Sequence, residues 1–254
     1  MVIENDKYGT RARQLELLSM FKEVDKLFRE NGIRYSLGGG SVLGAVRHNG
    51  FIPWDDDIDL MVDRENYAKI IELFDKGEHG TRFVLNKILW VYRIQDKDDK
   101  SGSIMTPTID IFVIDNYPDN AFVAKFKLLM IKLLQGMMKT EKTERKLSAF
   151  YRFCLFVTRI FGKLFTHNFK FKLYDRIARI GNGKKSRLVT CYFSPFSYLK
   201  FRFDNTLMEN IVDHEFEDTV APIVAEYDKY LTVQYGDYMT PPKEEDRVSQ
   251  HVSK

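Results

Sequence analysis

The feature of this sequence that most constrains its fold is a dense acidic cluster, Asp55-Asp56-Asp57-Ile58-Asp59, set between two apolar stretches. Residues 57–62 alternate in side-chain character, which is the pattern of a β-strand with one polar-bearing face. Asp57 and Asp59 are two apart, so their carboxylates leave the same face, close enough to bind one hard cation. A solvated acidic turn or a calcium loop is the alternative. The apolar residues on both sides favour a strand within a sheet.

A run of three glycines, Gly38-Gly39-Gly40, precedes the acidic strand by one short segment and is followed by Ser41. Glycines allow a sharp turn and a close approach to a ligand. Ser41 is a suitable N-cap for a brief helix through Val46. A Gly-Ser turn at a helix N-terminus presents backbone N–H groups and a hydroxyl, so we predict a phosphate-binding turn beside the Asp pair.

A third carboxylate, Asp110, lies inside an apolar run from Thr108 to Ile114 that is predicted to be a strand. A buried Asp without a partner is costly. Coordination of a metal ion or deprotonation of a substrate hydroxyl would give Asp110 a role. A structural Asp held by hydrogen bonds is the alternative.

Periodicity predicts the remaining elements, and the segments with helical spacing are residues 10–30, 64–74, 122–180 and 222–235. Further strands are predicted over residues 33–37, 83–85, 89–94, 188–193 and 198–203. This order predicts an α+β fold in which helices flank a mixed β-sheet and a basic helical block is inserted. We assign residues 1–120 to the catalytic core, 121–187 to the insertion and 188–254 to a C-terminal part that completes the core.

The net charge of +3 hides a strong asymmetry. Residues 121–203 carry 19 Lys or Arg and only 3 acidic residues, whereas the rest of the chain carries 20 basic and 33 acidic residues. Basic and apolar residues interleave in this block, as in helices that lie on an anionic membrane, and we predict that Lys125, Lys127, Lys132 and Lys139 contact lipid. A helical bundle with a basic exterior is an equal alternative. Nucleic acid is a weaker interpretation, because no binding module accompanies the charge.

Two observations bear on the cellular compartment. The N-terminus has no apolar run typical of a secretory signal, and no stretch of about 18 uncharged apolar residues could span a bilayer. Cys154 and Cys191 match no metal-ligand or redox spacing, so we interpret them as small buried hydrophobic residues. We therefore expect a cytoplasmic protein with peripheral contact to the inner face of a membrane.

Residues 37–60, read as LGGGSVLGAVRHNGFIPWDDDIDL, resemble the signature of the LicD family of phosphocholine transferases. The likeness continues through the strand around Asp110 and through residues 230–251, which end with Arg247 and His251. That family is similar in its core to the nucleotidyltransferase superfamily, so the resemblance implies a nucleotidyltransferase-like core. Family members commonly carry Thr where this chain has Ser41, which supplies the same hydroxyl.

The resemblance also implies a reaction. The donor would be a CDP-alcohol, typically CDP-choline, and CMP would be released. The acceptor would be a hydroxyl on a cell-surface glycan of teichoic acid, lipopolysaccharide or capsule type, lipid-linked glycans included. A Mg²⁺ or Mn²⁺ ion would be held by Asp57, Asp59 and Asp110, and Asp110 would serve as the base or as a shared ligand. The residues implied in donor binding are Gly39, Gly40, Ser41, Arg47 and His48.

Three other functions stay open at this point. The same site could transfer another phospho-alcohol, such as ribitol phosphate or glycerol phosphate. It could catalyse nucleotidyl transfer proper, in which pyrophosphate leaves. A non-catalytic metal-binding or lipid-binding module is the third, and the intact Asp57, Asp59 and Asp110 argue against it.

Overall fold

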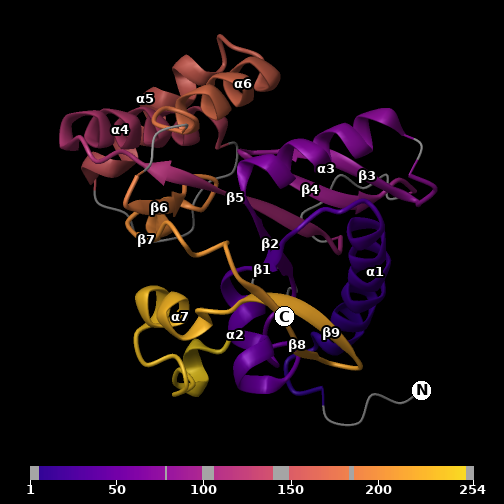
Figure 1. Ribbon diagram of the computed structural model, residues 1–254. Coiled ribbons are helices and arrows are strands. Elements are labelled where there is room, and N and C mark those ends of the chain that lie inside the picture. Colours follow the sequence, from indigo (N-terminus) through magenta and orange to yellow (C-terminus); the bar gives the residue numbers. More distant parts are fainter. Residues whose placement is uncertain (1–5, 78, 99–105, 140–148, 183–185, 250–254) are drawn as a thin grey trace. The chain divides into compact units, whose positions relative to one another are not determined.

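The computed structural model describes residues 6–77, 79–98, 106–139, 149–182 and 186–249. The chain forms two compact units, shown in Figure 1. The first contains residues 1–86, 92–114 and 206–254, and the second contains residues 87–91 and 115–205. Residues 188–205 belong to the second unit and residues 206–254 to the first.

A mixed β-sheet forms the centre of the first unit, as predicted. Its strand order is β1 (Ser36–Leu37), β2 (Ile58–Val62), β5 (Ile109–Tyr117), β4 (Val91–Asp96) and β3 (Phe83–Ile88). β2 runs antiparallel to β1 and parallel to β5, and β4 runs antiparallel to β5. Four of the five residues of β2 are buried, including both Leu60 and Met61, so the strand is covered on both faces.

Three helices of the first unit follow the predicted segments. α1 (Arg11–Glu30) ends at Asn31, as the Asn-Gly pair predicts, and α3 (Arg64–Lys76) is capped by the Asp63 carboxylate. α2 (Gly39–His48) begins two residues before Ser41, and its N-cap is Gly38. The expectation that Ser41 is the N-cap was wrong, because the Gly38 carbonyl already accepts the N–H groups of Ser41 and Val42.

The predicted helix over 222–235 was wrong in its first part. Residues 211–224 form a hairpin of β8 (Ile211–Phe216) and β9 (Thr219–Val224), and α7 covers only Tyr227–Tyr235. Pro222 is a favourable first residue for a helix, which suggested one. The β-branched residues beside it favour a strand, and Pro222 pairs with Asp213 in the hairpin ladder. Strand β9 lies beside β1, where Val224 N–H donates to Ser36 Oγ.

The second unit contains three helices, α4 (Ala121–Met138), α5 (Ala149–Gly162) and α6 (His167–Ala178), in the predicted helical block. α4 packs against both α5 and α6. The strand predicted over 188–193 is present as β6 (Leu188–Cys191), which pairs with β5 and with β7 (Phe203–Asp204). Of the strand predicted over 198–203, only Phe203 lies in a strand, at the start of β7. The rest of that prediction was wrong, because a 3-10 turn, Phe196–Tyr198, and a further turn precede β7.

Lys127 lies in the core of the second unit and is fully buried. Its ammonium group donates to the carbonyl oxygens of Asn116 at 3.0 Å and Ile180 at 2.8 Å, and it lies 3.9 Å from the centroid of the Tyr192 ring. These contacts compensate the loss of water around the charge. The prediction that Lys127 contacts a membrane was therefore wrong. Over the described residues, every helix is too short or too polar to cross a bilayer.

Candidate functional site

Two predicted site residues from distant segments meet in the central sheet. The parallel register of β2 and β5 pairs Asp59 with Asp110, and the antiparallel register of β4 and β5 pairs Arg93 with Asp110. Side chains of directly paired residues leave the same face of a sheet. The three side chains therefore form a row across three strands, with two carboxylates and one guanidinium.

The carboxylates of this row are crowded. Burial raises the pKa of Asp59 well above its ordinary value, and the neighbouring charges of Asp57, Asp110 and Asp55 raise it further, while Arg93 opposes them. Arg93 Nε lies 2.8 Å from Asp110 Oδ1, and each side chain is only 13% exposed. That contact is an ion pair without hydrogen-bond geometry, since Arg93 Nε has no hydrogen-bond partner. Arg93 is therefore a positive charge that opposes the carboxylates crowded around Asp59.

Asp55 and Asp56 have different environments. Burial raises the pKa of Asp55 to about 6, and the charge of Asp56 adds to the effect. Asp56 is fully buried and accepts a hydrogen bond from Ser249 Oγ at 2.5 Å. Helix α1 supports this segment, because Arg13 Nε donates to the Asp56 carbonyl at 2.7 Å and Gln14 Nε2 donates to the Asp55 carbonyl at 2.8 Å. Asp56 therefore holds the loop in place.

The glycine turn lies directly against the acidic segment. A Cβ atom added at Gly39 would lie 3.0 Å from Asp59 Oδ2, and one added at Gly40 would lie 2.6 Å from Asp55 Oδ2. Gly39 also has φ of +48°, which side chains rarely tolerate. A side chain at Gly39 would be strained by the backbone φ, and a side chain at Gly40 would require the Asp55 carboxylate to move.

Ser41 fixes the turn to strand β2. Its side-chain oxygen accepts a hydrogen bond from Asp59 N–H at 3.0 Å, and Gly38 N–H donates to the Asp59 carbonyl at 2.8 Å. Ser41 is buried, and its own N–H donates to the Gly38 carbonyl. The turn therefore forms hydrogen bonds with both the N–H and the carbonyl group of Asp59. This structural role of Ser41 was not predicted, and its role in donor binding stays a prediction.

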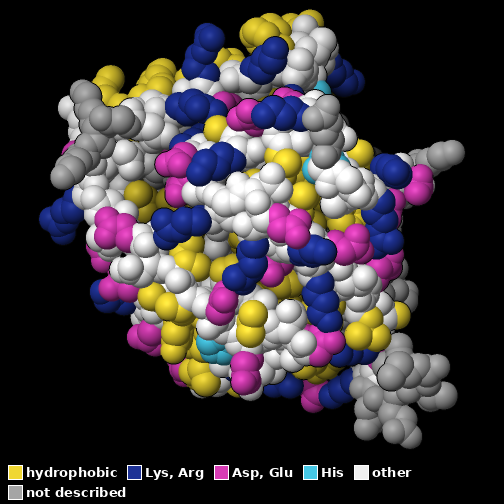
Figure 2. All heavy atoms as spheres, turned by 45° about the vertical axis from the view of Figure 1, so that its right-hand side comes forward, with side chains coloured by type: hydrophobic (Ala, Val, Ile, Leu, Met, Phe, Trp, Pro, Cys, Tyr) yellow, Lys and Arg dark blue, Asp and Glu magenta, His cyan; other side chains and the backbone are white. Residues whose placement is uncertain are grey.

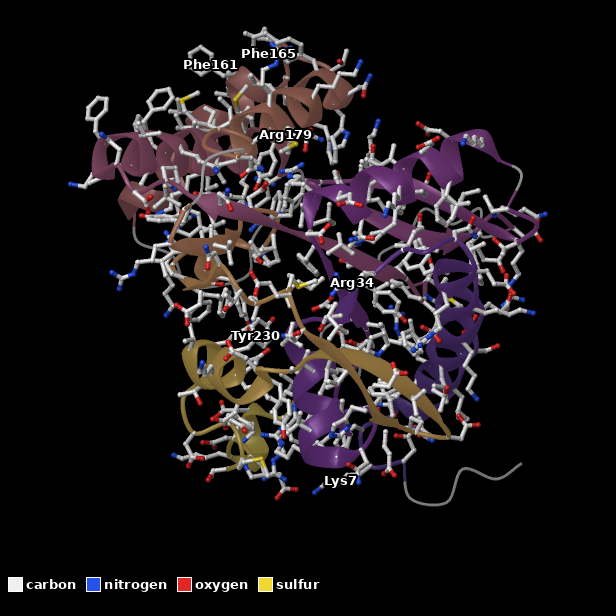
Figure 3. All side chains as sticks on the ribbon, viewed as in Figure 1. Lys7, Arg34, Phe161, Phe165, Arg179 and Tyr230 are labelled. Atoms are coloured by element: carbon white, nitrogen blue, oxygen red, sulfur yellow. The ribbon has the colours of Figure 1, made fainter. Side chains whose placement is uncertain are left out.

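Helix α7 contributes to the site from the far end of the chain. Figure 1 shows α2 and α7 side by side, and they are in contact. Tyr230, labelled in Figure 3, accepts a hydrogen bond from Gly39 N–H at 2.8 Å. An added Cβ at Gly39 would also lie 3.8 Å from Tyr235 Oη. Sequence reasoning gave these tyrosines no role, although they belong to the C-terminal segment that carries the family resemblance.

Two arginines lie against one tryptophan near the end of α2. Arg47 and Arg247 lie 6.0 Å and 5.2 Å from the centroid of a Trp54 ring, and the His48 ring meets Trp54 edge-on. Arg47 Nη1 donates to the Tyr238 carbonyl at 2.7 Å. Burial lowers the pKa of Arg47, and the charge of Arg247 lowers it further. Among the described residues neither arginine pairs with a carboxylate, so this cluster can attract an anion.

The His48 ring lies beside one of these cations. Burial lowers the pKa of His48, and the charge of Arg47 adds to the effect. Arg47 Nε donates to His48 Nε2 at 3.0 Å, an arrangement in which this ring nitrogen acts as the acceptor. His251, which belongs to the resemblance, lies outside the described residues.

The carboxylate oxygens in this row are chemically suited to bind a divalent metal ion. Oxygen ligands are those that Mg²⁺ and Mn²⁺ prefer, and a cation would offset the repulsion that raises the pKa of Asp59. Within the described part of the chain, no three His, Cys, Asp or Glu side chains converge as a preformed metal site. The metal ligands Asp57, Asp59 and Asp110 thus stay a prediction.

Comparison with known proteins gives matches of two kinds. Residues 32–132 match the family model described as LicD/FKTN/FKRP, nucleotidyltransferase domain. The chain is 27% identical to the lipopolysaccharide cholinephosphotransferase LicD of Haemophilus influenzae, and the match covers 97% of each protein. An uncharacterised protein of Rickettsia typhi is 37% identical over 43% of this chain and 36% of its own length. The ribitol 5-phosphate transferase FKRP of Mus musculus is 50% identical over 42 residues, which are 16% of this chain and 8% of FKRP.

Proposed function

Since this chain belongs to the LicD family through residues 32–132, we propose that it transfers phosphocholine to a hydroxyl of a lipopolysaccharide-type glycan. The observation that carries the proposal is the pairing of Asp59 with Asp110 in adjacent parallel strands, beside the glycine turn. The similarity to LicD of Haemophilus influenzae over 97% of both proteins supports phosphocholine as the transferred group.

The proposal also covers the type of fold, the donor and the leaving product. A Gly-Ser turn followed by an Asp-x-Asp strand, with a third Asp on the adjacent parallel strand, supports a nucleotidyltransferase-like core. We propose CDP-choline as the donor and CMP as the leaving product. Teichoic acid and capsule are further acceptor candidates of the same chemical kind.

The reaction requires one bond to form and one to break at a phosphorus atom. The acceptor oxygen attacks the phosphorus that carries choline, the bond from that phosphorus to the bridging oxygen breaks, and CMP leaves with the bonding electrons. The proton of the acceptor hydroxyl passes to a carboxylate or to water. A Mg²⁺ or Mn²⁺ ion held by Asp57, Asp59 and Asp110 would neutralise phosphate charge in this site.

The protein's own groups would position the reactants. Arg47 and Arg247 lie beside the Trp54 ring, and neither pairs with a carboxylate in the part of the chain that the structure describes, which supports a role in holding the diphosphate. Arg93 places a positive charge against the Asp110 carboxylate, with Nε 2.8 Å from Oδ1. That pairing supports Asp110 as a ligand or a source of charge over Asp110 as the base.

A second candidate function is transfer of ribitol phosphate or another phospho-alcohol. The observation that favours it is the 50% identity to FKRP, a ribitol 5-phosphate transferase, over 42 residues. The two candidates share the reaction at phosphorus and differ in the alcohol carried by the donor.

A donor panel tests the proposal. Purified protein is incubated with Mg²⁺, lipopolysaccharide and one donor at a time from CDP-choline, CDP-ribitol, CDP-glycerol and CTP, and released CMP and pyrophosphate are measured. We expect CMP release with CDP-choline that requires the acceptor, and loss of this release in Asp57→Asn and Asp59→Asn. The exposed Asp75→Asn on α3 is the matched control and should keep full activity. A preference for CDP-ribitol would favour the second candidate, and pyrophosphate from CTP would identify a nucleotidyltransferase.

A further inference from the structure

Large apolar side chains lie exposed on helices α4, α5 and α6 of the second unit and in the turn between α5 and α6. The exposed large hydrophobic residues between Phe122 and Phe169 are Phe122, Phe126, Leu129, Leu133, Phe153, Phe156, Ile160, Phe161, Leu164, Phe165 and Phe169. Phe122 is 81% exposed and Leu164 is 72% exposed. In the described parts of the chain every exposed Phe lies in the second unit. Soluble proteins rarely leave so many aromatic side chains in water on one set of helices.

The exposed residues follow helix periodicity. On α4 they recur at intervals of four, three and four residues from Phe122 to Leu133, which makes one continuous stripe. A different stripe of α4, including Lys127, Ile131 and Leu134, is the one that is buried. Phe153, Phe156 and Ile160 make a similar stripe on α5. Both helices therefore carry an apolar face in addition to the face that they use for packing.

Helices α4, α5 and α6 are closely packed against one another, so the apolar side chains are not exposed because the bundle is loose. A Cβ atom added at Gly136 of α4 would lie 2.6 Å from Thr158 Oγ1 of α5. Lys170 Nζ of α6 donates to the Met137 carbonyl at 3.2 Å and to the Gly162 carbonyl at 2.9 Å. The exposed stripes thus remain outside a bundle whose internal contacts are already made.

Positive charge surrounds the apolar faces. Residues 121–139 and 149–182 contain eleven Lys or Arg, of which Lys127 is buried, and one acidic residue, Asp175, which pairs with Arg179. Lys125, Arg152 and Lys163 are exposed among the aromatic residues. Figure 2 shows yellow and dark-blue side chains next to one another at the top of the view, and Figure 3 labels Phe161 and Phe165 at the outer surface of this region.

We propose that the exposed faces of α4, α5 and α6 form a docking surface for an anionic phospholipid bilayer. Phe and Leu side chains insert at the level of the headgroups, while the surrounding Lys and Arg contact lipid phosphates. The helices lie on the membrane and do not cross it. This inference stands apart from the proposed transferase activity, because it rests on the second unit alone.

The charge favours lipid over a second copy of the chain as the occupant. A symmetric dimer through this surface would bring two strongly basic faces together, which costs free energy by like-charge repulsion. A soluble polyanion would use the basic residues and leave the exposed Phe residues in water. An anionic bilayer is complementary to both the charge and the apolar side chains.

Co-sedimentation with vesicles tests the proposal. Vesicles of phosphatidylglycerol and phosphatidylcholine in equal parts are compared with pure phosphatidylcholine, without donor or acceptor. We expect the protein to sediment with the anionic vesicles at low salt and to be released as salt rises. Because each basic residue near an anionic surface strengthens partitioning about fivefold, the double variant Lys125→Gln and Lys163→Gln should weaken it roughly 10- to 30-fold. Lys26→Gln with Lys97→Gln, both exposed in the first unit, is the matched control and should bind as the wild type does.

A second pair of variants tests the apolar contribution. Phe153→Gln with Phe156→Gln should weaken partitioning about tenfold or more, whereas Val212→Gln with Val220→Gln, exposed on the β8–β9 hairpin, should not. All four side chains are exposed, so the melting temperatures should stay near that of the wild type.

Three results would overturn the proposal. They are wild-type protein that stays in the supernatant with anionic vesicles at low salt, equal binding of the Phe153/Phe156 variant, and a dimer in light scattering that the same variant converts to monomer. The donor panel is an independent experiment, so failure of membrane binding would leave the proposed reaction untouched.

Discussion

Replacement of Ser41 by Ala tests whether its hydroxyl holds the glycine turn in place or serves only to bind phosphate. The side-chain oxygen accepts the N–H of Asp59 at 3.0 Å inside a buried turn. In Ser41→Ala that N–H loses its side-chain partner inside the buried turn. Thr at this position keeps the hydroxyl and is the matched control.

The expected cost follows from the loss of one buried hydrogen bond. A buried N–H left without a partner costs about 1–3 kcal/mol in the free energy of unfolding. For a chain of this size each kcal/mol lowers the melting temperature by about 2–4 °C. Since Asp59 is the residue affected, the position of its carboxylate changes too, and turnover should fall together with stability.

Chemical denaturation gives the change in unfolding free energy, and release of CMP from CDP-choline gives the rate. We expect Ser41→Ala to lower both, and Ser41→Thr to keep both near the wild-type values. A Ser41→Ala variant with unchanged stability and a raised KM for the donor would refute the structural role and leave Ser41 as a ligand for phosphate only.

Four further predictions follow from the same site and its support. Asp59→Asn should reduce transfer below detection at unchanged far-UV circular dichroism, and near wild-type turnover would remove this residue from the reaction. Asp110→Asn should slow turnover about 10²- to 10⁴-fold if Asp110 is the base, or weaken Mn²⁺ binding in a calorimetric titration if Asp110 is a metal ligand. A variant with normal turnover and normal Mn²⁺ binding would exclude Asp110 from the site. Arg247→Gln should raise the KM for CDP-choline with little change in kcat, and an unchanged KM would contradict its role at the diphosphate. Burial acts to raise the pKa of Glu217, but hydrogen bonds from Arg11 and a backbone N–H lower it below its ordinary value of 4.5, so the ionised Glu217 stabilises the fold above pH 4.5 and this contribution is lost as pH falls through the lowered pKa. The loss of unfolding free energy in Glu217→Gln should therefore be larger at pH 7 than at pH 3.5. An equal loss at both pH values would contradict this linkage between pKa and stability.

Periodicity was sufficient to predict the strand that carries the site. The strand predicted at residues 57–62 and the apolar run around Asp110 became β2 and β5 with nearly the predicted bounds. Their parallel register, which pairs Asp59 with Asp110, joins segments about 50 residues apart, and no local pattern encodes it. Arg93 was missed for the same reason, because its place opposite Asp110 depends on the pairing of β4 with β5.

Two errors arose where one residue fitted two patterns. Pro222 suits the first turn of a helix, and its place in a two-stranded hairpin was not foreseen, although the β-branched neighbours Val220, Ile223 and Val224 pointed to a strand. Lys127 was grouped with the basic residues by composition. Its spacing from Ile131 puts it on the buried face of α4, so helix periodicity already contained the signal that it lies inside.

The central claim is that the carboxylate row on β2 and β5 transfers phosphocholine to a glycan hydroxyl. Mass spectrometry of the lipopolysaccharide acceptor after incubation with CDP-choline and Mg²⁺ tests it most directly. The account predicts a mass increase of one phosphocholine group per modified acceptor, with CMP released in equal amount and neither product formed by Asp59→Asn. An acceptor that instead gains a cytidylyl group, or an Asp59→Asn variant that forms the phosphocholine product at the wild-type rate, would contradict the account.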